Sequence, residues 1–122
     1  MSERDPFLTE TRTLVNADRA RIDPSKLTTY SLNPDHPVGG HKARRLKRVL
    51  GFDLSNAQEL LAQVKEGILT TPGRPYRVDR YGAHYTVDLI VRGANGVESL
   101  VRTGWTYDPG VFEPRLVTVF IP

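Results

Sequence analysis

The chain has 122 residues, enough for one folded domain and too few for two. It contains no cysteine, which excludes a disulfide framework and thiolate chemistry. Lys and Arg number 17 against 14 Asp and Glu, and the net charge of +3 permits nucleic-acid binding without requiring it. No apolar run is long enough to span a bilayer, and the first residues lack the shape of a signal peptide, so we expect no membrane segment.

The beginning of the chain shows no sustained periodicity. Residues 1–20 mix charges with Thr, and we interpret them as a tail or linker that precedes one domain over residues 21–122. Asp23 followed by Pro24 is typical of a helix start. This pair predicts a short helix through Tyr30, which ends before Pro34.

A polar loop over residues 33–41 leads into a strongly basic helix. Two prolines hold the loop extended, and Gly39 and Gly40 allow the backbone to approach a ligand closely. His36 and His41 lie at this turn. Because the free N–H groups at a helix start attract anions, the loop and helix together are suited to a phosphate.

The phase of the basic helix separates an apolar side from a cationic side at about 100° per residue. The residues expected to face the core are Ala43, Leu46, Val49 and Leu50. On the opposite side lie His41, Arg44, Arg45 and Arg48, which we expect to contact RNA phosphates unless they are an ordinary solvated helix face. Lys42 falls in the apolar sector, so it either extends over the rim of the core or points into a cleft.

A second helix is predicted after Gly51, a candidate C-cap. Ser55 and Gln58 have the spacing of a capping box, and Gly67 is expected to close the helix. An apolar stripe at helical spacing predicts its buried side: Ala57, Leu60, Leu61, Val64 and Ile68.

From Pro72 the hydrophobic period changes to alternation, interrupted by turn sequences. Strands are expected at Tyr76–Arg80, Ala83–Val91, Glu98–Tyr107 and Arg115–Ile121, with Asn95-Gly96 as a strong hairpin signal. Helices followed by a meander predict an α+β fold, in which N-terminal helices pack on one face of a four-stranded antiparallel sheet.

Alternation also assigns the two faces of the sheet. The residues expected to meet the helices are Tyr85, Val87, Leu89, Val101, Thr103, Trp105, Val117, Val119 and Ile121. The residues expected on the other face are His84, Thr86, Asp88, Arg102, Gly104 and Thr118. Gly104 would leave room there for a ligand, and Arg102 is either a phosphate-binding group or a solvated surface arginine.

Several chemistries are poorly supported by the residue inventory. The three histidines lack the spacing of a helix-borne zinc motif, no carboxylates cluster, and no nucleophile elbow, P-loop or dinucleotide fingerprint is present. We therefore expect no metal and no cofactor.

Metal-independent RNA cleavage suits the inventory of residues better, with His36 or His41 as base or acid. In that scheme Lys42 and Arg102 would clamp the phosphate, while Thr118 or Thr86 would serve as a neutral donor.

Several short sequences resemble an uncharacterised bacterial domain family, whose members occur as small proteins and as the C-terminal tips of polymorphic toxins. They include Leu32-Asn33-Pro34 with His36, Lys42-Ala43-Arg44, Val101-Arg102-Thr103 with Trp105, and Pro114-Arg115 with Val117-Thr118. The order of helices and strands also resembles the barnase, EndoU, colicin and RelE type ribonucleases. That resemblance implies metal-free RNA cleavage on the concave side of the sheet and a cognate immunity protein that holds a toxin inactive.

We therefore predict a monomeric ribonuclease toxin domain that cleaves tRNA or another structured RNA. It would be secreted or delivered as part of a larger toxin and would act in the cytoplasm of the target cell; otherwise it would be cytoplasmic. The predicted catalytic residues are His36, His41, Lys42, Arg102 and Thr118, and the predicted RNA-binding residues are Arg44, Arg45, Arg48, His84 and Thr86. The alternatives are a non-catalytic RNA-binding or protein-interaction module and an ADP-ribosyltransferase toxin that uses NAD.

A final expectation concerns the arrangement of this site. Lys42 should emerge where the basic helix meets the sheet, near Arg102, and the proline-glycine loop should bring His36 over the open face. The two cations would then be held together without a nearby carboxylate, an arrangement normally tolerated where an anion binds.

Overall fold

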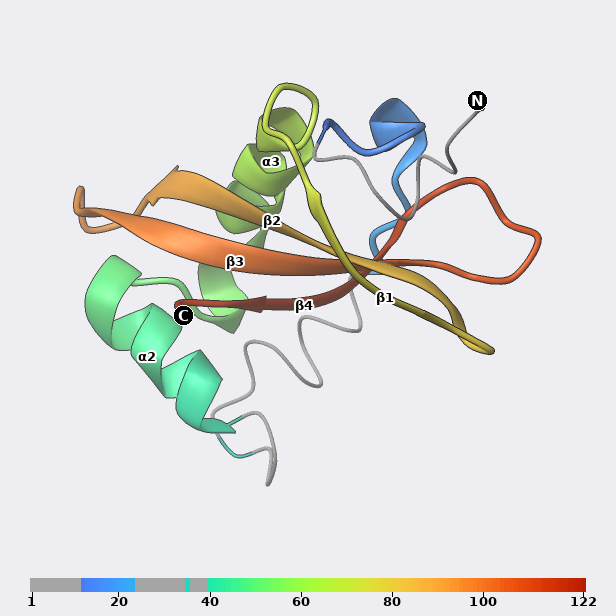
Figure 1. The fold of residues 1–122 in the computed structure, drawn as a ribbon. Helices are drawn as coiled ribbons and strands as arrows, with labels where there is room; N and C mark the ends of the chain where they lie inside the picture. Colours follow the sequence, from blue (N-terminus) through green and yellow to red (C-terminus); the bar gives the residue numbers. More distant parts are fainter. Residues whose placement is uncertain (1–11, 24–34, 36–39) are drawn as a thin grey trace.

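The computed structural model describes residues 12–23, 35 and 40–122 (Figure 1). Within these residues, two α-helices precede four strands. The elements are the 3-10 helix η1 (Ala17–Arg19), α2 (Gly40–Leu50), the 3-10 helix η3 (Leu54–Asn56), α3 (Ala57–Gly67), β1 (Arg74–Asp79), β2 (Gly82–Arg92), β3 (Glu98–Tyr107) and β4 (Arg115–Phe120). The predicted helix through Tyr30 lies outside the described residues.

The strands form one antiparallel sheet in the order β1-β2-β3-β4, which confirms the predicted α+β meander. β2 and β3 are the long central strands, and they pair without interruption from Ala83 opposite Tyr107 to Arg92 opposite Glu98. Gly96 has a φ of 85° in the turn between them, as the Asn95-Gly96 signal predicts. The register of this pair fixes which side chains meet across the sheet.

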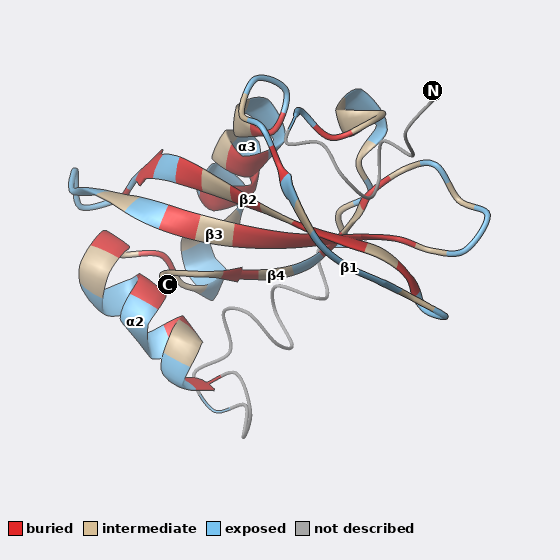
Figure 2. Cartoon of the chain, viewed as in Figure 1, coloured by how far each residue is buried: buried red, intermediate tan, exposed pale blue. Residues whose placement is uncertain are grey.

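The core lies between the sheet and the two α-helices, as the buried residues in Figure 2 show. Leu46 and Leu50 of α2 and Leu60 and Val64 of α3 are fully buried. They pack with the predicted inward residues of the sheet, among them Val87, Val101 and Trp105. The apolar stripes of both helices are therefore confirmed.

The largest fully buried side chain, that of Trp105, has its hydrogen-bond partner inside this core. Thr103 donates its hydroxyl to the carbonyl oxygen of Val87 at 2.8 Å and accepts from Nε1 of Trp105 at 2.8 Å. Because its only polar atom is hydrogen-bonded, Trp105 can be buried without an unsatisfied donor.

The start of α3 differs from the sequence prediction. The capping box is formed by Asp53 and Asn56 around η3, and not by Ser55 and Gln58. The Asp53 carboxylate accepts from the backbone N–H of Ser55 at 2.9 Å, and the Asn56 side chain accepts from the backbone N–H of Asp53 at 2.8 Å. An extra turn of 3-10 helix in front of α3 moves the cap two residues toward the N-terminus.

β4 also departs from simple alternation. Trp105 pairs with Leu116 and Gly104 pairs with Thr118, so Val117 is an extra residue that has no partner on β3. Leu116 is therefore buried, whereas Val117 is 40% exposed. The prediction that Val117 faces the core was wrong because this bulge breaks the period of two.

Residues 12–23, most of which the sequence pattern assigned to a tail, pack against the sheet. Leu14 belongs to the buried core, and the hydroxyl of Tyr107 donates to the carbonyl oxygen of Val15 at 2.6 Å. Arg21 forms a parallel bridge to Arg115 at the outer edge of β4. These contacts join the segment to both the core and the sheet.

The turn between β1 and β2 depends on Gly82, which yields the first testable prediction. Its φ is 125°, and a Cβ there would lie 2.0 Å from the carbonyl oxygen of Tyr107. We expect Gly82→Ala to lower the free energy of unfolding by more than about 3 kcal/mol, measured by urea unfolding. Gly96→Ala is the matched control, because a Cβ there meets nothing within 4 Å and only the left-handed backbone is strained, at about 1 kcal/mol. Equal losses in the two variants would contradict the steric account.

Candidate functional site

The face of the sheet opposite the core, called the open face below, carries a bidentate ion pair between β2 and β3. Asp88 and Arg102 stand directly opposite each other. Nε of Arg102 lies 2.8 Å from one carboxylate oxygen of Asp88, and Nη2 lies 2.9 Å from the other. The expectation that Arg102 has no carboxylate nearby was wrong. The hairpin signal at Asn95-Gly96 could have revealed this pair, because it sets the register that brings the two residues together.

The ion pair shifts the pKa of each partner in the direction that favours its charged form. The hydrogen bonds from Arg102 hold the pKa of Asp88 below its usual range, against the smaller opposing effect of burial. The positive charge of Arg74 on β1 lowers the same pKa further. The hydrogen bonds with Asp88 raise the pKa of Arg102. One carboxylate thus lies close to two arginines, which leaves this part of the open face with an excess of positive charge.

Lys42 extends this positive region from α2. Its ammonium nitrogen lies 4.1 Å from the centroid of the Phe120 ring, a favourable position for a cation over an aromatic ring. Phe120 is the cross-strand partner of Arg102 on β4. Lys42 therefore emerges where α2 meets the sheet, as predicted, and we call Lys42, Arg74, Asp88 and Arg102 the charged cluster.

Of the two histidines of the proline-glycine loop, His41 lies within the described residues. His41 is exposed in the first turn of α2, one residue before Lys42. His36 lies outside the described residues, so its predicted approach to the open face stays a prediction.

The middle of the open face is filled by Thr118. Gly104 stands between Thr86 on β2 and Thr118 on β4. A Cβ at Gly104 would lie 2.7 Å from the side-chain methyl of Thr118, so that methyl occupies the space above the glycine. The prediction that Gly104 leaves room for a ligand was wrong. Thr86 and Thr118 nevertheless lie on the open face, in the row next to Asp88 and Arg102.

His84 has partners on both sides of its ring. Nε2 lies 2.9 Å from Oδ1 of Asp79, and Nδ1 lies 2.9 Å from Oγ1 of Thr106. The side chain is 9% exposed. The hydrogen bond with His84 is the largest of the causes that hold the pKa of Asp79 below its usual range. His84 thus fixes the β1–β2 hairpin, which limits the direct contact with RNA that the sequence predicts for it.

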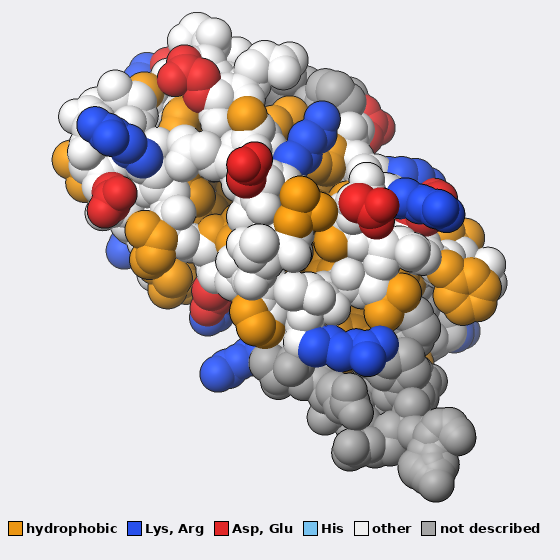
Figure 3. Space-filling view, turned by 90° about the horizontal axis from the view of Figure 1, so that it is seen from above, with side chains coloured by type: hydrophobic (Ala, Val, Ile, Leu, Met, Phe, Trp, Pro, Cys, Tyr) orange, Lys and Arg blue, Asp and Glu red, His pale blue; other side chains and the backbone are white. Residues whose placement is uncertain are grey.

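The cationic side of α2 faces solvent. His41, Arg44, Arg45 and Arg48 are exposed, whereas Ala43 and Leu46 on the other side are buried, as the helical phase predicts. The face seen in Figure 3 is different, because Lys and Arg lie there among Asp, Glu and hydrophobic side chains. The arginines of α2 are therefore a local concentration of positive charge.

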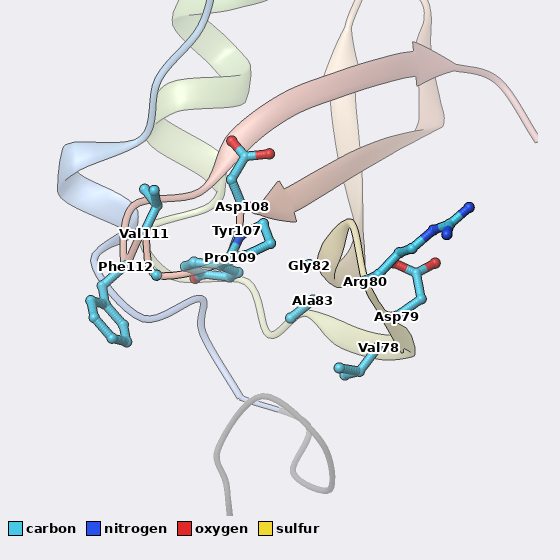
Figure 4. A pocket seen from close by; sticks show the side chains of 11 residues that line it. Val78, Asp79, Arg80, Gly82, Ala83, Tyr107, Asp108, Pro109, Val111 and Phe112 are labelled. Carbon is cyan, nitrogen blue, oxygen red and sulfur yellow. The ribbon is translucent and has the colours of Figure 1, made fainter.

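A pocket of about 330 Å³ lies where the β1–β2 turn meets the loop between β3 and β4 (Figure 4). Its apolar wall includes Val78, Ala83, Pro109 and Phe112. Val78 pairs with Ala83, and Ala83 pairs with Tyr107, whose side chain belongs to the core. Val78 and Ala83, the strand residues of this apolar wall, thus have the parity of the core side, whereas the charged cluster lies on the open face.

Two further properties concern the described residues alone. No group of three His, Asp or Glu side chains in residues 12–23, 35 and 40–122 is arranged to hold a metal ion. No helix in these ranges is long and apolar enough to cross a membrane.

The chain resembles a known family in sequence and a solved structure in fold. A family model described as "Domain of unknown function (DUF6883)" matches residues 13–122. No curated protein matches the sequence. The structure is similar to a chain of a contact-dependent growth inhibition toxin–immunity protein complex from Klebsiella pneumoniae 342, with a TM-score of 0.63. Sequence identity is 14%, and the match covers 86% of this chain and 95% of that chain, so the likeness shows a common fold.

The ion pair of the charged cluster leads to a prediction about acid. Because the folded-state pKa of Asp88 lies below its ordinary value of 3.8, the pair stabilises the fold fully above that value. Its contribution is lost as the pH falls through the folded-state pKa. We expect an NMR titration of Asp88 to give a midpoint below 3.8 in the wild type and a higher midpoint in Arg102→Gln. Identical midpoints in the two proteins would contradict the proposed cause.

Proposed function

The chain belongs to the DUF6883 family, and we propose that it is a toxin domain with metal-independent ribonuclease activity on tRNA or another structured RNA. The charged cluster carries this proposal. Arg102 and Arg74 both act on the single carboxylate of Asp88, and a third cation, Lys42, lies over Phe120, the residue opposite Arg102 on β4. An excess of cations at one end of an open sheet face is suited to an RNA phosphate.

In this mechanism the cluster binds and stabilises the reacting phosphate. A base removes the proton of a 2′-hydroxyl, the 2′-oxygen attacks phosphorus, and the bond to the 5′-oxygen breaks as that oxygen takes up a proton. Arg102 and Lys42 would stabilise the extra negative charge of the pentavalent intermediate, with Thr118 as a neutral donor nearby. We assign the proton transfers to His36 and His41 because the ring nitrogens of His84 already have partners.

The toxin role is supported by the fold. The similar chain belongs to a complex of a contact-dependent growth inhibition toxin with its immunity protein. We propose from this likeness that the present chain is the toxic component, that a cognate immunity protein blocks it, and that it acts after delivery into a target cell.

A non-catalytic RNA-binding or protein-interaction module is the second candidate. It is favoured by the two hydrogen bonds that occupy Nε and Nη2 of Arg102, since these donors would otherwise be available to a substrate. Catalysis requires that Asp88 release Arg102 or that the remaining donors of Arg102 contact the phosphate. A binding module requires neither change.

Cleavage of labelled tRNA in the presence of EDTA separates these candidates. We expect the wild type to cleave with EDTA present, because the proposed mechanism uses side chains alone. Arg102→Gln should slow cleavage about 100-fold, as expected when one stabilising donor group is removed from a transition state. Arg19→Gln, an exposed arginine on η1, should leave the rate unchanged. Binding without cleavage would favour the second candidate, and cleavage lost in EDTA but restored by Mg²⁺ would contradict the mechanism.

The basic side of α2 gives a separate prediction about binding. Arg45 and Arg48 are exposed, and each should contribute affinity by neutralising an RNA phosphate. Replacing each with Gln should reduce the slope of log Kd against log salt concentration by about one unit for each phosphate that is no longer neutralised. Arg19→Gln again serves as the control. An unchanged slope would assign these arginines to the solvated surface.

A further inference from the structure

β1 is an edge strand that presents an aromatic side chain at an irregular position. Pro75 pairs with Tyr85 and Arg77 pairs with His84, so Tyr76 is an extra residue without a partner on β2. Its side chain is 58% exposed, and its ring centroid lies 5.9 Å from that of His84. A bulge changes the direction of a side chain, and here it exposes a tyrosine beside a histidine of the open face.

A second exposed tyrosine lies at the turn that follows β1. Tyr81 is 62% exposed, and the guanidinium carbon of Arg80 lies 5.1 Å from its ring centroid. Tyr76 has the same kind of neighbour, with the guanidinium carbon of Arg77 at 5.8 Å. We call Tyr76, Arg77, Arg80 and Tyr81 the tyrosine–arginine platform.

The platform is held in place by Asp79. This carboxylate accepts from the backbone N–H of Tyr81 at 2.9 Å, and it also lies 2.9 Å from Nε of Arg77 and 2.9 Å from Nε2 of His84. The turn is fixed further by Gly82, whose backbone passes close to that of Tyr107. Because the turn is already ordered, binding to it would cost little additional conformational entropy.

The charge of the platform points to a polyanion. Arg74, Arg77 and Arg80 are all exposed on this hairpin. Within the described part of the chain only Arg77 of the three has a carboxylate oxygen within 4.0 Å, whereas Arg74 acts on Asp88 from farther away. Figure 4 shows the Arg80 side chain extending away from Phe112 and Pro109, so it does not fill the pocket. A protein partner could also use aromatic and arginine side chains, but the excess of unpaired cations favours phosphates.

We infer that the tyrosine–arginine platform binds a single-stranded segment of RNA, with bases stacked on Tyr76 and Tyr81 and phosphates on the adjacent arginines. Aromatic rings that alternate with cations are the arrangement by which proteins bind single strands without reading sequence. Arg74 connects the platform to the charged cluster, because it precedes Tyr76 by two residues and acts on Asp88. This inference rests on the proposed function and adds that the substrate is unpaired beside the cleaved bond.

The test uses a non-cleavable probe, so that binding is measured apart from cleavage. The probe is a fluorescein-labelled 2′-O-methyl oligouridine of eight nucleotides, and an eight-base-pair RNA duplex is the comparison. Fluorescence anisotropy should show that the full chain binds the single strand more tightly than the duplex. Tyr76→Ala and Tyr81→Ala should each raise the Kd for the single strand roughly 10-fold, whereas Tyr76→Phe, which keeps the ring, should change it less than about 3-fold.

The matched control is Phe112→Ala, because Phe112 is also 62% exposed but lies on the loop after β3. It should leave the Kd unchanged, and thermal midpoints should confirm that all variants fold. Single-strand binding that depends on both tyrosines supports the inference even if the wild type cleaves no RNA, a result that would sink only the ribonuclease proposal. Cleavage by the wild type with equal Kd values for all tyrosine variants would overturn the inference and leave the ribonuclease proposal intact. Equal affinity for the duplex and the single strand would overturn it as well.

Discussion

The uninterrupted register of β2 and β3 is the constraint on which the rest of the structure depends. On the core side it places Val87 opposite Thr103, whose hydroxyl accepts a hydrogen bond from Nε1 of Trp105. On the open face the same register places Asp88 against Arg102. A slip of one residue would bring the charged side chains into the core and the apolar side chains into solvent. The apolar contacts that stabilise the sheet therefore also determine the geometry of the candidate site.

Local patterns were sufficient to predict much of this fold. Alternation in β2 and β3 and the Asn95-Gly96 turn gave the sheet order, and helical spacing gave the buried residues of α2 and α3. The failures involve contacts that a local pattern does not contain. The bulge at Val117 depends on how β4 meets β3, and the burial of Leu14 depends on contacts with strands far along the chain.

The candidate site was only partly predictable for the same reason. Alternation along the strands assigned Arg102, Thr86 and Thr118 to the face opposite the core, and the structure places them on this open face. Side-chain partners were harder to foresee: Lys42 lies over Phe120, and the Thr118 methyl covers Gly104. Tyr76 was missed altogether, because a bulge in an edge strand leaves no periodic signal in the sequence.

The two edges of the sheet differ in how they are protected from pairing with another sheet. At β4, the backbone N–H of Arg21 donates to the carbonyl oxygen of Pro114, and the N–H of Leu116 donates to that of Arg21, so part of this edge is covered by the chain itself. At β1, Pro75 lacks an N–H group and the bulge at Tyr76 interrupts the row of donors and acceptors. Open sheet edges are templates for aggregation, and both devices limit it. Among the described residues both α-helices pack on one face of the sheet, and neither edge thus offers a straight template for cross-β growth.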